Sequence, residues 1–366
     1  MKPHIFAYLP PALLLTGLLF RCQPATTDSP MNTPASKPGF YVDGRFLHDP
    51  CGTKITLRGI NKMNVWTDRA GASFAEIAKT GANCVRIVWL ATDEDTKQPT
   101  KAADLDNLIT KCVAQQMIPI VEVHDATGDW SKLGAMVDYW KRPDIVAVIK
   151  KHERYLLVNI ANECGDDQVK DDEFIAGYSQ AVQQLRQAGI HTPLVIDGTD
   201  FGKNLEQLVK VGPPVIQADP DRNLLFSVHT YWPATDGATP AFIRQQFQSA
   251  VDAGLPFIVG EFAAYGAYAG INPQTGKPES SCGPKGRINY QTIVSEAQRL
   301  DIGWLIWEWG PGNDVDDHLC EIMDLTTNST FATLKGWGKE VVLAGDNSIQ
   351  KTAVRSPFLL NGMTCK

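Results

Sequence analysis

The segment VNIANE at residues 158–163 is an apolar, β-branched run that ends abruptly in an amide and a carboxylate, Asn162 and Glu163. This pattern is typical of a strand that is buried on both faces and whose polar end emerges from the fold. A second run, FIVGEF at residues 257–262, carries Glu261 near its end. If both strands belong to an α/β barrel, the two glutamates meet at the mouth where such barrels hold their active sites.

Apolar runs of strand length recur along the chain and alternate with amphipathic segments of helical spacing. The predicted strands lie at residues 55–60, 85–90, 118–124, 156–163, 193–197, 224–231, 256–262 and 303–309, and the predicted helices at 70–80, 103–116, 172–188, 240–253, 288–300 and 331–343. Eight such units predict an α/β fold, a (β/α)8 TIM barrel. The run FYVDGRF at residues 40–46 predicts a short N-terminal β-hairpin that plugs one end. A doubly wound open sheet is the alternative, but no G-x-G-x-x-G loop follows the first predicted strand.

The two ends of the chain differ in composition from the predicted barrel domain at residues 39–345. Residues 1–22 resemble an export signal, because Lys2 precedes a mostly apolar run that is too short to span a bilayer. Cys22 is either a lipidated cysteine of a lipoprotein or part of a plain secreted protein. Residues 23–38, rich in Pro, Ser and Thr, predict a flexible linker, and residues 346–366 form a C-terminal extension. We therefore expect a protein that is secreted, periplasmic or held at the cell surface.

Charge and cysteine content narrow the function further. The 366 residues carry a net charge of −7, which argues against a nucleic-acid partner and suits a neutral substrate. Eight cysteines fit an oxidising compartment. Cys282 and Cys320 are the predicted disulfide, whereas Cys84 and Cys112 are expected to be small buried hydrophobes. Since no cysteine or histidine group has zinc spacing, we expect no metal.

Polar and aromatic residues collect where the predicted strands end. They are Arg86, His124, Asn162, Glu163, His229, Tyr231, Glu261 and Trp307. A buried strand gains nothing from such groups unless they are hydrogen-bonded, and in a barrel they converge on one mouth. We expect Arg86 and Tyr231 to contact Glu261 and to favour its charged form.

Two carboxyl groups with opposite duties are what hydrolysis of a glycosidic bond needs. We assign Glu163 as the acid/base and Glu261 as the nucleophile, with Asn162 holding a sugar hydroxyl. Trp307 offers a flat face for a pyranose ring, and Trp66, Trp130 and Trp232 in loops are expected to extend that platform. Arg86, His124, His229 and Tyr231 complete the predicted substrate-binding set.

The ordered set of motifs resembles glycoside hydrolase family 5. The motifs are GANCVRIV (81–88), EVHDATG (122–128), NIANE (159–163), FSVHTY (226–231), VGEF (259–262) and GWLIWEW (303–309), and the resemblance covers residues 40–340. GINKMNVW (59–66) and GWLIWEWGPGN (303–313) are similar to the bacterial β-mannanase branch. The resemblance implies a retaining enzyme with a (β/α)8 barrel and no cofactor. It also implies the acid/base position for Glu163 and the nucleophile position for Glu261.

Three residues depart from the pattern of that branch. Cys164 stands where Trp is usual, Glu308 where Ser is usual, and Gly310 where Lys is common. We expect them at or near the cleft, so they leave the sugar preference open.

The sequence therefore predicts a monomeric, retaining, endo-acting β-1,4-glycanase that acts on a plant-type neutral polysaccharide. Mannan is the predicted substrate. A cellulase of the same family is one alternative, and a barrel that binds glycan without cutting it is another. Membrane attachment is expected only through a lipidated Cys22.

Overall fold

Eight parallel strands close into a barrel and follow one another around the ring in chain order. The computed structural model describes residues 1, 37–266, 286–313 and 323–365. The barrel strands are β4 (Arg58–Lys62), β5 (Cys84–Trp89), β6 (Ile118–Val123), β7 (Leu157–Asn159), β8 (Leu194–Asp197), β9 (Leu224–His229), β10 (Phe257–Glu261) and β11 (Gly303–Ile306). β11 pairs with β4 and closes the ring. The predicted (β/α)8 TIM barrel is confirmed, and the open-sheet alternative is wrong.

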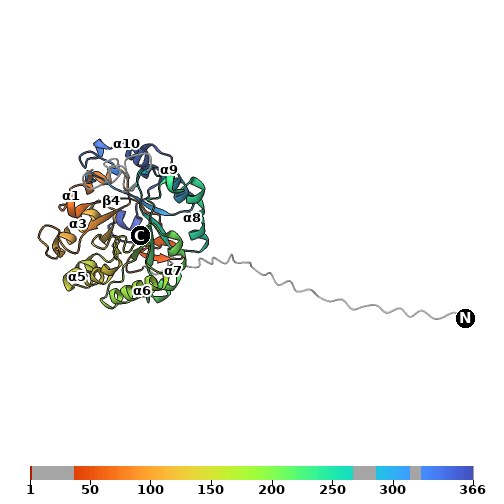
Figure 1. Cartoon of the computed structure of the whole chain (residues 1–366), viewed down its shortest axis with the longest axis horizontal. Helices are drawn as coiled ribbons and strands as arrows, with labels where there is room; N and C mark the ends of the chain where they lie inside the picture. The colour runs from red at the N-terminus through yellow and green to blue at the C-terminus, as the bar shows by residue number, and fades with distance from the viewer. Residues whose placement is uncertain (2–36, 267–285, 314–322, 366) are drawn as a thin grey trace, which may run out of the picture. The chain divides into compact units, whose positions relative to one another are not determined.

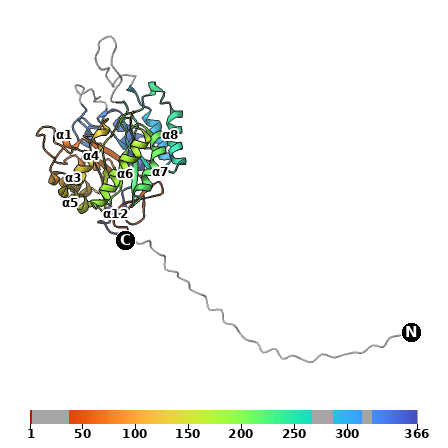
Figure 2. The ribbon, with the colours of Figure 1, turned by 60° about the horizontal axis from the view of Figure 1, so that its bottom comes forward.

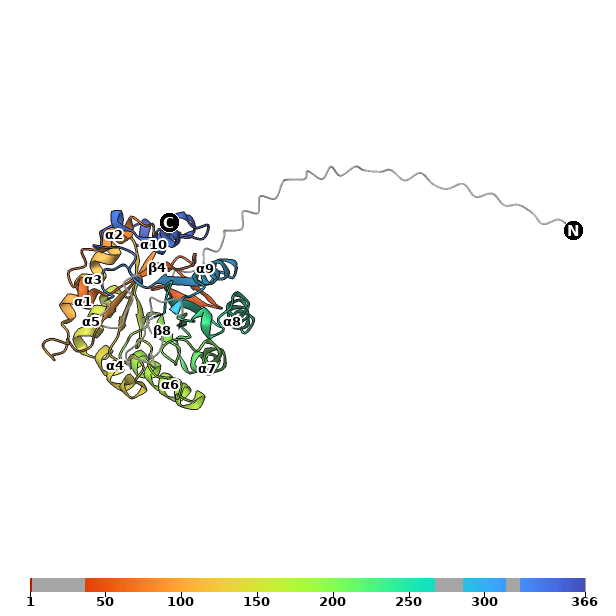
Figure 3. The ribbon, with the colours of Figure 1, turned by 45° about the horizontal axis from the view of Figure 1, so that its top comes forward.

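Helices surround the barrel, as Figures 1 and 3 show. They are α1 (Asn64–Thr67), α2 (Phe74–Ala78), α3 (Ala102–Ala114), α4 (Leu133–Trp140), α5 (Pro143–His152), α6 (Asp171–Gln187), α7 (Leu205–Ala218), α8 (Pro240–Asp252), α9 (Tyr290–Arg299) and α10 (Gly336–Lys339). Capping side chains and a proline determine where two of these helices begin. The Thr239 hydroxyl caps α8 by accepting from the Phe242 N–H, and Pro240 takes the first helical position. The Asn204 side chain caps α7 by accepting from the Gln207 N–H.

Two predicted strands differ most from those in the structure. The run at 55–60 splits between β3 (Lys54–Ile55), which belongs to a separate sheet, and β4. The run at 156–163 ends as a strand at Asn159. The chain leaves the ladder there, and it reaches Glu163 in a left-handed conformation with a φ of 45°.

A small antiparallel sheet covers the N-terminal end of the barrel. It contains the predicted hairpin, β1 (Tyr41–Asp43) and β2 (Phe46–His48), and β3 as a third strand. The Val42 N–H donates to the Asn223 side chain, 2.9 Å away, directly before β9 begins. The hairpin therefore closes the end of the barrel that lies opposite the strand termini bearing the polar residues.

The C-terminal segment packs on the same small sheet. After α11 (Ile349–Thr352), α12 (Pro357–Leu360) lies at one end of the barrel (Figure 2). The Phe358 ring meets the Phe40 ring edge-on at 6.3 Å, and the Ser356 hydroxyl donates to the Asp49 carboxylate. A disulfide joins Cys51 to Cys365. The segment predicted as an extension is thus built into the fold.

Some sequence predictions fall outside the described residues. These are the export signal at residues 2–22, the linker through residue 36, the state of Cys22, and the Cys282–Cys320 disulfide. Cys84 and Cys112 are fully buried, as predicted, and so is Cys164. Within the described ranges, no helix has the length and apolarity needed to cross a membrane.

Candidate active site

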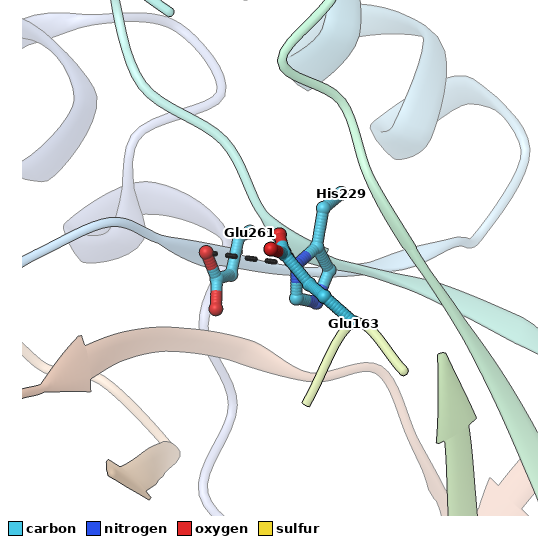
Figure 4. A group of neighbouring side chains, drawn as sticks. All are labelled: Glu163, His229 and Glu261. Carbon is cyan, nitrogen blue, oxygen red and sulfur yellow. Dashed lines mark hydrogen bonds and ion pairs between the residues drawn. The ribbon is translucent and has the colours of Figure 1, made fainter. Parts of the chain in front are cut away.

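Glu163 and Glu261 face each other at the C-terminal mouth of the barrel. Glu261 is the last residue of β10, and Glu163 lies four residues beyond the end of β7. A carboxylate oxygen of each and a ring nitrogen of His229 all lie within 4.8 Å of one another (Figure 4). Both glutamates line a cavity of about 880 Å³. Their separation is close to the roughly 5–5.5 Å at which one carboxylate attacks a sugar while the other exchanges a proton.

Two donors hold the carboxylate of Glu261, and both were expected from the sequence. Arg86 Nη1 donates to Glu261 Oε1 at 2.6 Å, and the Tyr231 hydroxyl donates to Oε2 at 2.8 Å. Burial raises the pKa of Glu261, while the positive charges of His229 and Arg86 oppose that rise. The donors also fix the direction in which the carboxylate points.

Arg86 is the centre of a buried hydrogen-bond network beneath the cavity. Its Nη2 donates to Asn162 Oδ1 at 2.6 Å, its Nε and Nη2 both donate to Asn159 Oδ1, and its Nη1 donates to Asn61 Oδ1. Burial by itself lowers the pKa of Arg86, but the carboxylates of Glu122, Glu261 and Asp197 outweigh it and raise the pKa above its ordinary value. The guanidinium therefore stays charged while it orients its neighbours.

His229 bridges the two glutamates. Its Nδ1 lies 2.7 Å from Glu163 Oε1 and 3.6 Å from Glu261 Oε2. Burial lowers the pKa of His229, but the carboxylates of Glu261, Asp197 and Glu163 outweigh burial and raise the pKa to about 9. The imidazole is therefore positively charged at neutral pH and stabilises the negative charge that surrounds it.

The backbone of Glu163 is held in a strained conformation by a neighbouring strand. Its φ of 45° lies in the left-handed region, which residues with a Cβ adopt at a cost. The Glu163 N–H donates to the Asp197 carboxylate at the end of β8, 3.0 Å away. This contact turns the Glu163 side chain toward His229 and the cavity.

Three rings form an aromatic wall on another side of the cavity. The His124 ring stacks on Trp307 at 5.9 Å, and Trp66 meets His124 edge-on at 5.5 Å. Trp307 Nε1 donates to Asn313, whose side-chain amide in turn donates to the buried carboxylate of Asp324. The orientation of Trp307 is therefore fixed from behind.

Nine of the eleven predicted site residues lie at the cavity or directly behind it. Those that line the cavity are Trp66, His124, Glu163, Tyr231, Glu261 and Trp307. Arg86, Asn162 and His229 are fully buried behind the lining. The Asn162 side-chain amide faces Thr127 and His124 rather than the open cavity, because Arg86 occupies its carbonyl oxygen.

Trp130 and Trp232 lie away from the two glutamates. The Trp130 ring stacks on Phe174 of α6 and packs against Tyr178, and it does not line the cavity. Trp232 is buried and donates through Nε1 to the Lys203 carbonyl. It borders a neighbouring cavity of about 430 Å³ that shares Lys203 and Tyr231 with the first. Neither ring lines the cavity that contains the glutamates, so a role for them in a sugar platform stays a prediction.

None of the three residues that depart from the β-mannanase pattern lines the cavity that contains the glutamates. Glu308 is fully buried, lies 3.6 Å from the Lys62 ammonium, and accepts from the Met63 N–H. The Cys164 thiol is buried and donates to the Asp129 carbonyl. Gly310 leaves room for Asp324, because a Cβ there would lie 2.6 Å from the Asp324 Cβ. They lie near the cleft, as expected, because Cys164 follows Glu163 and Glu308 follows Trp307, but they act on the packing behind the lining.

Several supporting residues were not predicted from the sequence. Asn61, Glu122, Asn159 and Asp197 are buried on barrel strands and contact Arg86 or its partners. Each of these residues is a polar residue within or at the end of an apolar strand. The same pattern identified Arg86 and could have identified them. Phe201, after β8, lines the cavity and gave no such signal.

Among the residues that the structure describes, one group has the spacing of a metal site, and it consists of Glu163, His229 and Glu261. Two positive charges, those of Arg86 and the imidazolium of His229, already neutralise this cluster. They oppose a metal cation at the same place.

Comparisons with known proteins agree on one family. The family model described as "Cellulase (glycosyl hydrolase family 5)" matches residues 48–313. A mannan endo-1,4-beta-mannosidase from Salipaludibacillus agaradhaerens is 31% identical over 324 residues, which are 86% of this chain and 94% of that protein. A mannan endo-1,4-beta-mannosidase from Streptomyces lividans is 31% identical over 93% of this chain and 82% of its own length. The mannohexaose complex of the Thermomonospora fusca β-mannanase superposes with a TM-score of 0.73 at 29% identity, over 88% of this chain and 100% of that chain.

Proposed function

We propose that this chain, which belongs to glycosyl hydrolase family 5 and is a glycoside hydrolase, is a retaining endo-β-1,4-mannanase with Glu261 as nucleophile and Glu163 as acid/base. The observation that carries the proposal is the pair of carboxylates within 4.8 Å of each other in an 880 Å³ cavity at the barrel mouth. This separation suits direct attack on a sugar and leaves too little room for an intervening water.

The proposed reaction has two displacements. Glu261 attacks the anomeric carbon while the bond to the leaving sugar breaks, and Glu163 gives its proton to the departing oxygen. Glu163 then takes a proton from water, which attacks the same carbon and releases Glu261. Arg86 and Tyr231 hold the attacking oxygens in place, which preorganises the first step.

Mannan is the proposed substrate because the relatives that span most of this chain are named for it. A polymer of this kind is degraded outside the cell, which agrees with the export predicted from residues 1–22. The six lining residues that were predicted from the sequence contain both aromatic faces and hydrogen-bonding groups, the combination that sugars require.

The test compares reducing-sugar release from β-mannan and from carboxymethylcellulose by the full chain. We expect faster release from mannan. Faster release from carboxymethylcellulose would replace the mannanase proposal with the cellulase alternative, and release from neither would favour the glycan-binding barrel.

A further inference from the structure

An exposed aromatic ring that no motif predicted stands at the rim of the active-site cavity. Phe201 is 45% exposed, one of the few large hydrophobic side chains at the surface of the described residues. It follows β8 and lines the cavity that contains Glu163 and Glu261. Ligand-binding cavities are lined predominantly by hydrophobic and aromatic side chains, so the place of this ring in the cavity is what draws attention to it.

The backbone that displays this ring is strained. Asp200, Phe201 and Gly202 follow one another with φ values of 53°, 56° and 77°, all in the left-handed region. Glycine adopts this conformation freely, but the two residues with side chains do so at a cost. Strain of this kind persists where the surrounding structure enforces it, and it concentrates at functional sites.

Several contacts fix the strained turn to the residues around Glu163. The Phe201 N–H donates to the Gly165 carbonyl at 3.2 Å, and the His229 N–H donates to the Gly202 carbonyl at 2.9 Å. The ring lies against Gly128, where an added Cβ would come within 2.4 Å of it. Gly128 in turn donates its N–H to the Glu163 carbonyl. The Phe201 ring is thus held in a set position relative to the proposed acid/base.

The position of Phe201 in the ring of strands identifies its side of the cavity. β8 lies four strands from β4 in either direction, so Phe201 stands across the barrel from Trp66, which follows β4 in α1. Trp66, His124 and Trp307 form the aromatic wall already described. Since the acid/base must touch the departing oxygen, the leaving sugar lies on the side of Glu163 and Phe201.

We propose that Phe201 is a sugar-binding platform for the leaving-group portion of the polysaccharide, packing against the apolar face of a pyranose ring. This inference rests on the proposed function. Lys203 lines the cavity beside it, with its ammonium 5.9 Å from the Phe201 ring centre and 3.3 Å from the Asp200 carboxylate. The polar pair is placed to meet the hydroxyls at the edge of such a sugar.

The test compares the full chain and its Phe201→Ala variant on two substrates. β-Mannobiosyl fluoride has a single fluorine atom as its leaving group, whereas mannohexaose has sugars on both sides of the broken bond. We expect Phe201→Ala to lower kcat/KM on mannohexaose about tenfold, as for loss of a stacking contact, and to change it less than about twofold on the fluoride. Phe201→Tyr, which keeps the ring, is expected to retain activity on both.

The controls separate binding from folding. Leu360→Ala removes a similarly exposed side chain on α12, and we expect it to change neither rate. An equal loss on both substrates in Phe201→Ala, or no loss on mannohexaose, would overturn the proposal. A Trp66→Ala variant that showed the same selective loss as Phe201→Ala would place both rings on one side and would also overturn it. A wild-type chain inactive on both substrates would instead refute the proposed function.

Discussion

The guanidinium of Arg86 donates a 2.6 Å hydrogen bond to the carboxylate of Glu261, and both side chains are almost completely buried. Removing the carboxylate therefore has two effects. The proposed nucleophile is lost, and the Arg86 guanidinium stays buried without its charge partner. Glu261→Gln separates them, because its amide oxygen still accepts from Arg86.

We expect Glu261→Gln to lower kcat on mannan by about 10⁴-fold or more while mannohexaose still binds. Glu206→Gln is the matched control, since that exposed carboxylate borders the neighbouring cavity and not the one with the glutamates. The rates come from reducing-sugar assays, and binding comes from calorimetry. Retained turnover in Glu261→Gln would remove this residue from the mechanism.

Glu163→Ala tests the acid role. A leaving group that departs readily needs little protonation, so the variant is expected to act nearly normally on a dinitrophenyl glycoside in the first step. On mannan, whose leaving group is a sugar alcohol, we expect a loss of about 10²–10⁴-fold. Pre-steady-state release of dinitrophenol measures the first step directly. Equal losses on both substrates would contradict the acid assignment.

The raised pKa of His229 predicts a pH dependence of stability. Because the pKa rises from 6.5 to about 9 on folding, the stabilisation is fully present below about pH 6.5 and is lost as the pH increases through 9. A shift of this size corresponds to roughly 3 kcal/mol. The melting temperature of the wild type should therefore exceed that of His229→Asn most at pH 6, with the gap narrowing toward pH 10.

His191→Asn is the control for this series, because His191 is exposed and lies far from the barrel mouth, before β8. The melting temperature of His191→Asn is expected to stay close to that of the wild type at every pH. A difference in melting temperature between the wild type and His229→Asn that increases as the pH rises would refute the prediction.

The Cys51–Cys365 disulfide predicts sensitivity to reductant. The two cysteines are 314 residues apart, and closing a loop of that length restricts the unfolded chain strongly. We expect the double variant Cys51→Ser/Cys365→Ser to lose about 2–4 kcal/mol of unfolding free energy, with little change in kcat at low temperature. Any lowering of the melting temperature by dithiothreitol that persists in the double variant would report the predicted Cys282–Cys320 bond.

The strained turn at Phe201 predicts an unusual order of stabilities. Phe201→Gly and Phe201→Ala both remove the ring, but only glycine adopts a φ of 56° without steric cost. The glycine variant is expected to be more stable than the alanine variant by about 1 kcal/mol. Chemical denaturation measures the difference, and Gly128 variants are unsuitable because a side chain there would strike the ring. An alanine variant of equal or greater stability would show that the turn relaxes.

The parts of the fold that the sequence predicted well are those in which one local pattern decides the outcome. An apolar run with a polar end identified β5, β6, β9 and β10, and it placed Glu261 at the mouth. Helix α7 was missed because Pro213 and Pro214 lie inside it, and proline normally ends a helix. Helices α4 and α5 were missed between two clearer strands.

Features that depend on distant parts of the chain left no local signal. The partner of Cys51 lies at the other end of the chain, and nothing in the sequence near either cysteine identifies the pair. Trp130 and Trp232 have the composition of sugar-binding loops, yet tertiary packing against α6 and α8 decides their orientation. Phe201 resembles any loop phenylalanine in the sequence, because its position depends on backbone angles that the residues alone do not reveal.

The bond between Cys51 and Cys365 makes the intervening chain a covalent ring. A protease that cuts one surface loop within this ring opens it without releasing a fragment, so the cleaved molecule remains one particle with two new ends. Such nicked material would migrate as a single band on a non-reducing gel and as two bands after reduction. A single cut within the ring therefore leaves both pieces of the chain covalently joined.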